Sequence, residues 1–162
     1  MIRRTGAVVA LAAALAVAAP AAPASAAVNQ GPRPLVNAVQ PVQAGQRTWV
    51  QVYWVSRRDV CDAQVTVVGD GVRVKYPANT ESFTSFQRNA TLAAGDYDYT
   101  AFRVTAKVPR KRATVVKLQV TISYTQLPRG TFGGGVDPET VPCTGKQLTR
   151  TSWVKLPVLT AR

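Results

Sequence analysis

Gln46 to Val55 reads Gln-Arg-Thr-Trp-Val-Gln-Val-Tyr-Trp-Val, and this stretch decides the fold class. One side of it carries residues suited to a core at every second position, namely Thr48, Val50, Val52 and Trp54. The other side carries polar and aromatic residues, namely Trp49, Gln51 and Tyr53. A period of two is typical of a β-strand with one buried face. The stretch therefore predicts a strand of a layered sheet protein.

A second segment repeats this layout later in the chain. Ala44-Gly45-Gln46 leads into the first segment, and Ala94-Gly95-Asp96 leads into the second. The second segment then alternates through Thr100, Phe102, Val104 and Ala106. We expect the two segments to pair in one sheet.

Further alternating runs predict the remaining strands, and no helical periodicity follows residue 26. Gly69-Asp70-Gly71 between two such runs predicts a β-hairpin, and Leu127 to Gln147 is predicted to be a long loop. The strand count of seven to eight indicates an all-β sandwich, and it disfavours the alternative, a five-stranded oligonucleotide-binding barrel. The predicted strands beyond the first segment are Leu35–Gln40, Cys61–Val67, Val72–Tyr76, Gln87–Leu92, Asp96–Val108, Thr114–Tyr124 and Arg150–Leu159.

The amino terminus has the order of an export signal. Met1-Ile2-Arg3-Arg4 is basic, residues 7–19 are apolar, and Ala24-Ser25-Ala26 supplies the small residues of a cleavage site. The apolar run is shorter than the roughly 20 residues that a bilayer span needs. We expect residues 1–26 to be a cleaved signal peptide and the product to be secreted. Residues 27–34 are then an extended amino-terminal segment, and residues 35–162 form one domain.

The charge of the chain limits its partners. The chain contains 20 Lys and Arg and 8 Asp and Glu, which gives a formal net charge of +12. Removal of Arg3 and Arg4 with the signal peptide lowers the net charge to +10. Such an excess attracts polyanions at long range, and the attraction weakens with salt. The expected partners are a cell-wall polymer, a polysaccharide or an envelope protein, and nucleic acid is not expected. The alternative is that the arginines serve solubility alone.

Cys61 and Cys143 are the only cysteines, and the chain contains no histidine. A secreted chain meets an oxidising compartment, so the two cysteines predict one disulfide. Two sulfurs without histidine cannot form an ordinary zinc site. We expect neither a metal nor a cofactor.

The order of the segments resembles immunoglobulin-like modules of bacterial secreted and surface proteins, with adhesion-related domains nearest in type. The likeness runs from Leu35 to Tyr124, and the loop that bears Cys143 departs from it. It rests on Ala-Gly-Gln before the first strand, Leu92-Ala93-Ala94-Gly95-Asp96 before its partner, and the closing Ile122-Ser123-Tyr124. The resemblance implies an antiparallel immunoglobulin-like β-sandwich in which the connections alternate between two ends. Ser56–Val60 and Leu127–Gln147 would then share one end, where the disulfide staples the long loop.

The residues for catalysis are missing from the sequence. Without histidine a hydrolase triad lacks its ordinary base. Ser152 and Lys155 match a Ser-x-x-Lys motif, but residues three apart on a strand point to opposite faces. Asp96 and Asp98 supply too few oxygens for calcium, and we interpret them as solvated residues at a strand start. The chain is therefore predicted not to be an enzyme.

An aromatic strip is the first candidate binding surface. If Gly45 and Gly95 mark equivalent starts, Trp49 lies near Tyr99 and Tyr53 near Arg103. Flat aromatic surfaces bind sugar rings by stacking, which favours a carbohydrate-binding module. The alternative is that the residues before Leu35 or the segment Pro77–Phe86 cover the rings. The candidate stacking residues are Trp49, Tyr53, Tyr97 and Tyr99.

A basic connection between two strands is the second candidate surface, for phosphate groups of wall polymers. A solvated turn without a ligand is the alternative. The leading prediction is a secreted, non-catalytic immunoglobulin-like domain that binds at or near the cell envelope, with carbohydrate or polyanion binding as alternatives. The candidate polyanion-binding residues are Lys107, Arg110, Lys111, Arg112 and Lys117.

Overall fold

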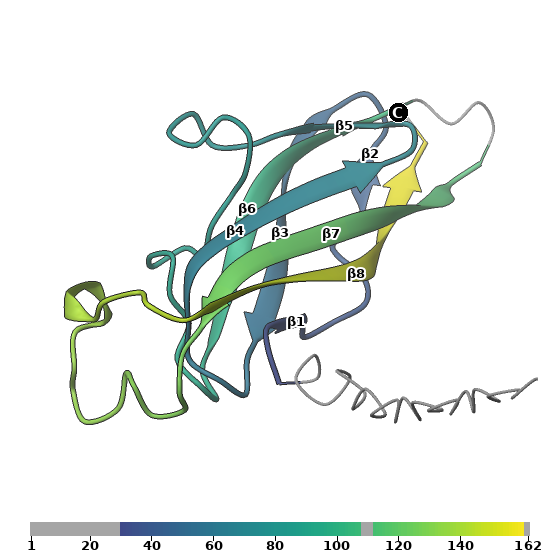
Figure 1. The fold of residues 1–162 in the computed structure, drawn as a ribbon. Helices are drawn as coiled ribbons and strands as arrows, with labels where there is room; N and C mark the ends of the chain where they lie inside the picture. Colours follow the sequence, from purple (N-terminus) through teal and green to yellow (C-terminus); the bar gives the residue numbers. More distant parts are fainter. Residues whose placement is uncertain (1–29, 108–111, 161–162) are drawn as a thin grey trace, which may run out of the picture.

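The structure is a computed structural model that describes residues 30–107 and 112–160 (Figure 1). Among these residues the chain forms two four-stranded β-sheets and no α-helix. Sheet A has the order β1-β3-β6-β5, with β1 (Arg33–Pro34), β3 (Arg47–Val55), β6 (Tyr97–Ala106) and β5 (Val72–Lys75). Sheet B has the order β2-β8-β7-β4, with β2 (Val42–Gln43), β8 (Lys146–Leu159), β7 (Thr114–Gln126) and β4 (Val60–Gly69). The predicted all-β class and two-sheet arrangement are confirmed.

The two segments with matching layouts pair as expected. β3 and β6 are antiparallel neighbours over nine residue pairs, from Arg47–Thr105 to Val55–Tyr97. Along β3 the side chains of Val50, Val52 and Trp54 are buried, as their period of two predicts. This pair of strands forms the centre of sheet A.

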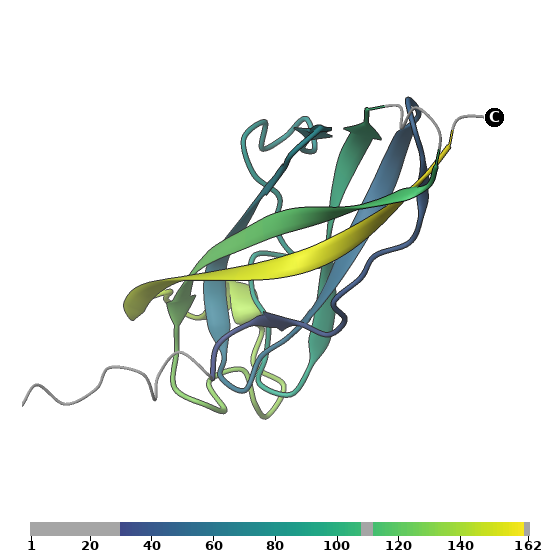
Figure 2. The same cartoon turned by 90° about the vertical axis from the view of Figure 1, so that its right-hand side faces the viewer.

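β7 is the corresponding central strand of sheet B. It pairs with β8 along its whole length and with β4 on its other side. Leu118, Val120 and Ile122 are buried, whereas Lys117 and Gln119 are exposed, so the predicted two-sided pattern is confirmed. Long twisted strands curl a sheet, and Figure 2 shows β7 and β8 crossing over the strands of sheet A.

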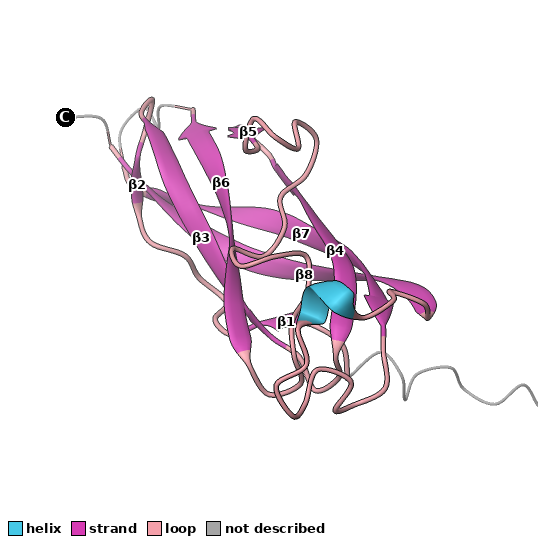
Figure 3. Ribbon diagram, turned by 90° about the vertical axis from the view of Figure 1, so that its left-hand side faces the viewer, coloured by secondary structure: helices cyan, strands magenta, loops and turns pink. Residues whose placement is uncertain are grey.

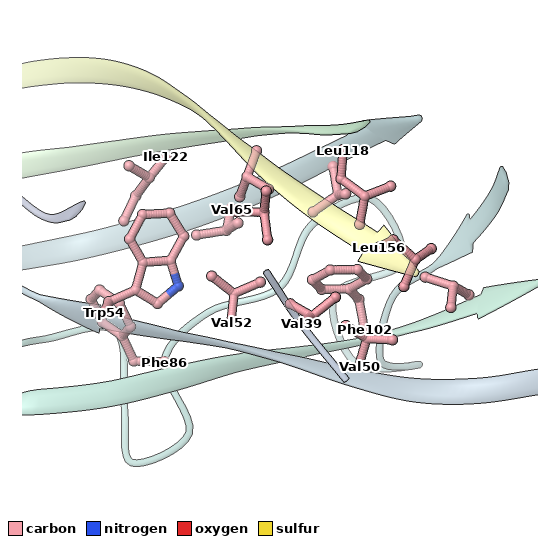
Figure 4. Close-up of a cluster of buried hydrophobic side chains, with 14 of the residues drawn as sticks. Val39, Val50, Val52, Trp54, Val65, Phe86, Phe102, Leu118, Ile122 and Leu156 are labelled. Carbon is pink, nitrogen blue, oxygen red and sulfur yellow. The ribbon is translucent and has the colours of Figure 1, made fainter. Parts of the chain in front are cut away.

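The core lies between the two sheets, and Trp54 is its largest fully buried side chain (Figure 4). Trp54 is fully buried, and its indole Nε1–H donates a hydrogen bond of 3.0 Å to Thr100 Oγ1 on the neighbouring strand. A buried indole needs such a partner, because an unpaired N–H in a core costs free energy. Buried side chains from both sheets fill the rest of the cluster, among them Val52, Val65, Phe102, Leu118, Ile122 and Leu156.

The predicted hairpin at Gly69–Gly71 is wrong. The chain does turn there, with Gly71 at a φ of 69°, but the flanking strands enter different sheets. β4 pairs with β7, and β5 pairs with β6. The edge of β4 that a hairpin would use instead makes single bridges from Val60 to Leu92 and from Val65 to Thr84. An Asp-Gly dipeptide therefore specifies the reversal of the chain but not the partner of the strand that follows.

Two predicted strands are crossing segments in the structure. Leu35–Gln40 leaves β3 and reaches β8, where Val39 N–H donates to the carbonyl of Lys155. Gln87–Leu92 follows an irregular path, with one bridge from Leu92 to Val60. A segment that moves between sheets cannot form a long ladder in either of them. β8 also begins at Lys146, earlier than the predicted Arg150.

The predicted signal peptide, residues 1–26, lies outside the described residues. Of the predicted extended segment 27–34, the structure describes residues 30–34, and these end in the short strand β1. Within the described part of the chain, no helix is long and apolar enough to cross a bilayer.

Candidate functional site

The outward-facing side chains of β1, β3, β5 and β6 form one surface, called the sheet A face below. Alternation on these strands sends every second side chain outward, which exposes the predicted aromatic residues. The exposed fractions are 62% for Tyr97, 45% for Trp49 and 38% for Tyr53, and Tyr99 is half-buried. All four candidate stacking residues therefore lie on the same face of one sheet.

The expected neighbours within this strip are wrong. Because β3 and β6 are antiparallel, Trp49 pairs with Arg103 and Tyr53 pairs with Tyr99. The Arg103 guanidinium lies over the Trp49 ring at 4.7 Å from its centroid, a cation–π contact. The rings of Tyr53 and Tyr99 lie 5.5 Å apart and are tilted by 48°. The strip is therefore a Trp–Arg pair and a tilted Tyr pair, separated by the row that contains Gln51 and Ala101.

A hollow of about 500 Å³ occupies that intermediate row. Ala101 is small, so the surface dips between Trp49 on one side and Tyr99 on the other. Of the two segments that could have covered the rings, only Pro77–Phe86 contributes to the hollow, through Pro77 at its edge. Two residues outside those segments flank the strip. Gln40 Nε2 donates to the Trp49 carbonyl at 3.0 Å, and Gln87 N–H donates to the Tyr99 carbonyl at 2.9 Å. The residues that line the hollow are Gln40, Trp49, Gln51, Pro77, Gln87, Tyr99 and Ala101.

The structure describes only part of the predicted polyanion cluster. Arg110 and Lys111 lie outside the described residues. Lys107 and Arg112 are exposed at the two sides of this gap, after β6 and before β7. Lys117 lies within β7, beside Lys155 of β8, on the outer face of sheet B. Lys117 therefore belongs to a strand surface and not to the connection.

The predicted disulfide between Cys61 and Cys143 is confirmed, with the Cα atoms 5.9 Å apart. It ties the start of β4 to the long connection between β7 and β8, which contains the 3₁₀ helix Pro138–Thr140 (Figure 3). The two sulfurs are bonded to each other and are not available as thiolate ligands for a metal.

Asp59 also holds connections together at the disulfide end of the molecule, a role that the sequence did not predict. Its side chain is 1% exposed and joins three connections. Oδ1 accepts the N–H of Ala94 at 2.6 Å, and Oδ2 accepts the N–H of Phe132 at 3.2 Å. The Asp59 carbonyl accepts the N–H of Leu127 at 2.8 Å. Nothing in the sequence separates this carboxylate from the exposed Asp62, because its partners come from distant segments.

Replacement of Asp59 by alanine is expected to lower the free energy of unfolding by about 2 to 3 kcal/mol, because two backbone N–H groups lose their acceptor. Asp59→Asn should cost less, since one oxygen remains. Urea unfolding followed by tryptophan fluorescence measures both values. Asp62→Asn is the matched control and should change stability by less than about 0.5 kcal/mol. Equal losses for Asp59→Asn and Asp62→Asn would contradict this role.

The other acidic and nucleophilic candidates lie on or beside β6 and β8. Asp98 is buried rather than solvated, and its carboxylate accepts the N–H groups of Arg88 and Tyr99. Asp96 is exposed before β6. Ser152 and Lys155 lie on opposite faces of β8, as the spacing of three predicts for a strand.

No protein-family model and no curated protein matches the chain. Among solved structures, the chain is similar to one described as "AvmM Catalyzes Macrocyclization in Alchivemycin A Biosynthesis", with 8% sequence identity and a TM-score of 0.37. The similarity covers 78% of this chain and 92% of that chain. Values this low carry no argument about what this chain does.

Proposed function

We propose that the chain is a secreted, non-catalytic, immunoglobulin-like domain that acts at or near the cell envelope and holds a carbohydrate on the sheet A face. The observation that carries the proposal is the hollow between Trp49 and Tyr99, which combines aromatic walls with amide side chains.

The order of strands in the two sheets supports the immunoglobulin-like assignment. Constant-type immunoglobulin domains place strands A, B, E and D in one sheet and strands C, F and G in the other. If the strands other than β2 are lettered A to G in chain order, the sheet β1-β3-β6-β5 reads A-B-E-D. The strands β4, β7 and β8 of the other sheet are then C, F and G. The disulfide departs from that pattern, because it joins β4 to the β7–β8 connection and not one sheet to the other.

The composition of the hollow supports a carbohydrate as the ligand. A sugar ring has apolar C–H faces that pack on aromatic rings, and its rim of hydroxyl groups both donates and accepts hydrogen bonds. Trp49 and Tyr99 offer the aromatic contact. A glutamine amide can both donate and accept hydrogen bonds, which matches a hydroxyl group. Gln40 Nε2 already donates to the Trp49 carbonyl and Gln51 Oε1 already accepts from the Tyr53 hydroxyl, so the second N–H of Gln40 and the amide N–H groups of Gln51 remain for a ligand. The amides at the hollow come from Gln40, Gln51 and Gln87.

The polar groups of the described residues support binding without catalysis. The chain has no histidine, and the buried carboxylates Asp59 and Asp98 both accept backbone N–H groups. A general base must reach a proton of its substrate, and both carboxylates are instead committed to holding loops. Secretion is supported by the disulfide, a bond that forms in oxidising compartments.

Titration with soluble polysaccharides should test this function. We expect tryptophan fluorescence to change on addition of at least one member of a panel of dextran, xylan, polygalacturonate and alginate. Isothermal titration, which does not depend on the removed tryptophan, should show that Trp49→Ala weakens that binding about tenfold, because a stacking contact is worth about 1.4 kcal/mol. Trp153→Ala is the matched control, since Trp153 is 60% exposed on the outer face of sheet B. Equal loss in the two variants, or no binding to any member, would overturn the proposal.

A further inference from the structure

The sheet A face carries a group of cations beside the aromatic strip. Arg47, Thr105 and Arg73 form one row across β3, β6 and β5, and Trp49, Arg103 and Lys75 form the next row. Neighbouring strands lie about 4.8 Å apart and successive outward residues about 6.7 Å apart, so the four cations share a small area. They are Arg47, Arg73, Lys75 and Arg103.

No carboxylate balances these cations within the described residues. None of the outward positions on β1, β3, β5 and β6 is Asp or Glu. In the same part of the chain, none of the four cations has an ion-pair partner. Arg103 makes a cation–π contact with Trp49, which leaves its charge unneutralised. Grouped like charges repel one another, and an anionic ligand that spans them would relieve the repulsion.

The cations and the hollow meet at one pair of residues. Trp49 forms a wall of the hollow, and Arg103 lies over its ring at 4.7 Å. Lys75 is paired with Arg103 on the adjacent strand. A ligand that stacks in the hollow therefore lies beside a guanidinium and an ammonium group. An arginine fork matches the two oxygens of a carboxylate better than it matches a lone hydroxyl.

We propose that the sheet A face binds an acidic polysaccharide, with a sugar ring in the hollow and ring carboxylates against Arg103, Lys75 and the neighbouring Arg47 and Arg73. This inference rests on the proposed carbohydrate-binding function and adds the chemical class of the sugar. The face favours a polysaccharide over single-stranded nucleic acid for two reasons. The Tyr53 and Tyr99 rings are tilted by 48° and do not form a flat platform for bases, and the hollow offers three amides to hydroxyl groups.

Carboxylate recognition can be separated from sugar recognition with two pairs of polymers. The two members of a pair share one backbone and differ only in whether their carboxylates are free. The probes are polygalacturonate and alginate, each compared with its own ester form, in which the carboxylates are blocked. Isothermal titration of the full chain at low salt should show binding to at least one free acid at least about tenfold tighter than to its ester. Raising NaCl from about 20 mM to about 500 mM should weaken binding to the acid and leave the ester unchanged.

Charge variants test whether the cations of the sheet A face cause the tighter binding of the free acid. The double variant Arg73→Gln, Lys75→Gln should weaken binding to the free acid about tenfold and leave binding to the ester unchanged. The matched control is Lys117→Gln, Lys155→Gln, which removes the same charge from adjacent residues of β7 and β8 on the outer face of sheet B. The control should bind the free acid as the unmodified chain does.

The outcomes distinguish this inference from the proposed function. Equal affinity for acid and ester, with loss in Trp49→Ala, would overturn the acidic class and leave carbohydrate binding standing. Equal loss in both charge variants would also overturn it, because net charge alone would then explain the attraction. Tighter binding of an oligodeoxythymidylate than of either free acid would assign the face to nucleic acid. Absence of binding to all four polymers, with no response in the wider panel, would overturn both proposals.

Discussion

Replacement of Trp54 by alanine is expected to lower the free energy of unfolding by about 4 kcal/mol. Trp54 is fully buried and is among the largest side chains of the core. Truncation to alanine removes its apolar contacts with both sheets and leaves a cavity that a close-packed interior refills only in part. The change also removes the indole donor from Thr100 Oγ1, which is itself fully buried.

Urea unfolding monitored by far-ultraviolet circular dichroism is the appropriate measurement, because it does not depend on the tryptophan that is removed. Trp153→Ala is the matched control, since it removes the same side chain from a position that is 60% exposed. We expect the control to change stability by less than about 0.5 kcal/mol. If Trp54→Ala does not fold, Trp54→Phe still tests the prediction. It keeps most of the volume, loses the hydrogen bond and should cost about 2 kcal/mol. Equal effects in the two tryptophan positions would contradict the packing described here.

Removal of the disulfide is expected to have an effect of similar size. The bond joins residues separated by 82 positions, and the chain-entropy relation for such a loop gives about 4 to 5 kcal/mol at 25 °C. The stabilisation arises in the unfolded state, which the bond prevents from expanding. The variant Cys61→Ser, Cys143→Ser should therefore unfold at much lower urea concentration, although its sheets keep their other contacts.

Reduction supplies a control for this experiment. Dithiothreitol should destabilise the unmodified chain by about as much as the double substitution does, and it should not affect the double variant. Asp59 still ties the β7–β8 connection to the same end of the molecule through Phe132. We therefore expect the reduced protein to fold, at lower stability. A double variant as stable as the oxidised chain would show that the closed loop contributes nothing.

The local pattern of the sequence predicted the layers correctly but not how they connect. Alternation placed β3, β6 and β7 and identified their buried faces, because the face that a side chain occupies depends only on its position along a strand. The Asp-Gly turn predicted a hairpin, yet β4 and β5 belong to different sheets. β5 pairs with β6 at the edge of sheet A, and a dipeptide carries no information about such a distant partner.

At the candidate site, too, the sequence predicted which side chains face outward but not which residues are neighbours. The sequence identified Trp49, Tyr53, Tyr97 and Tyr99 as outward residues but assigned their neighbours wrongly, because antiparallel pairing reverses the order of one strand. The cations Arg73 and Lys75 were not part of any predicted site. They reach the aromatic strip only because β5 joins the edge of sheet A beside β6.

By itself, the sequence determined the all-β class, the buried faces of the main strands and the single cysteine pair, since each follows from residue type and local spacing. Only the tertiary structure decided the partner of each strand, the register that sets Arg103 over Trp49, and the burial of Asp59. These features join segments far apart in the chain. Their energies depend on packing and hydrogen bonds that exist only once both sheets have formed.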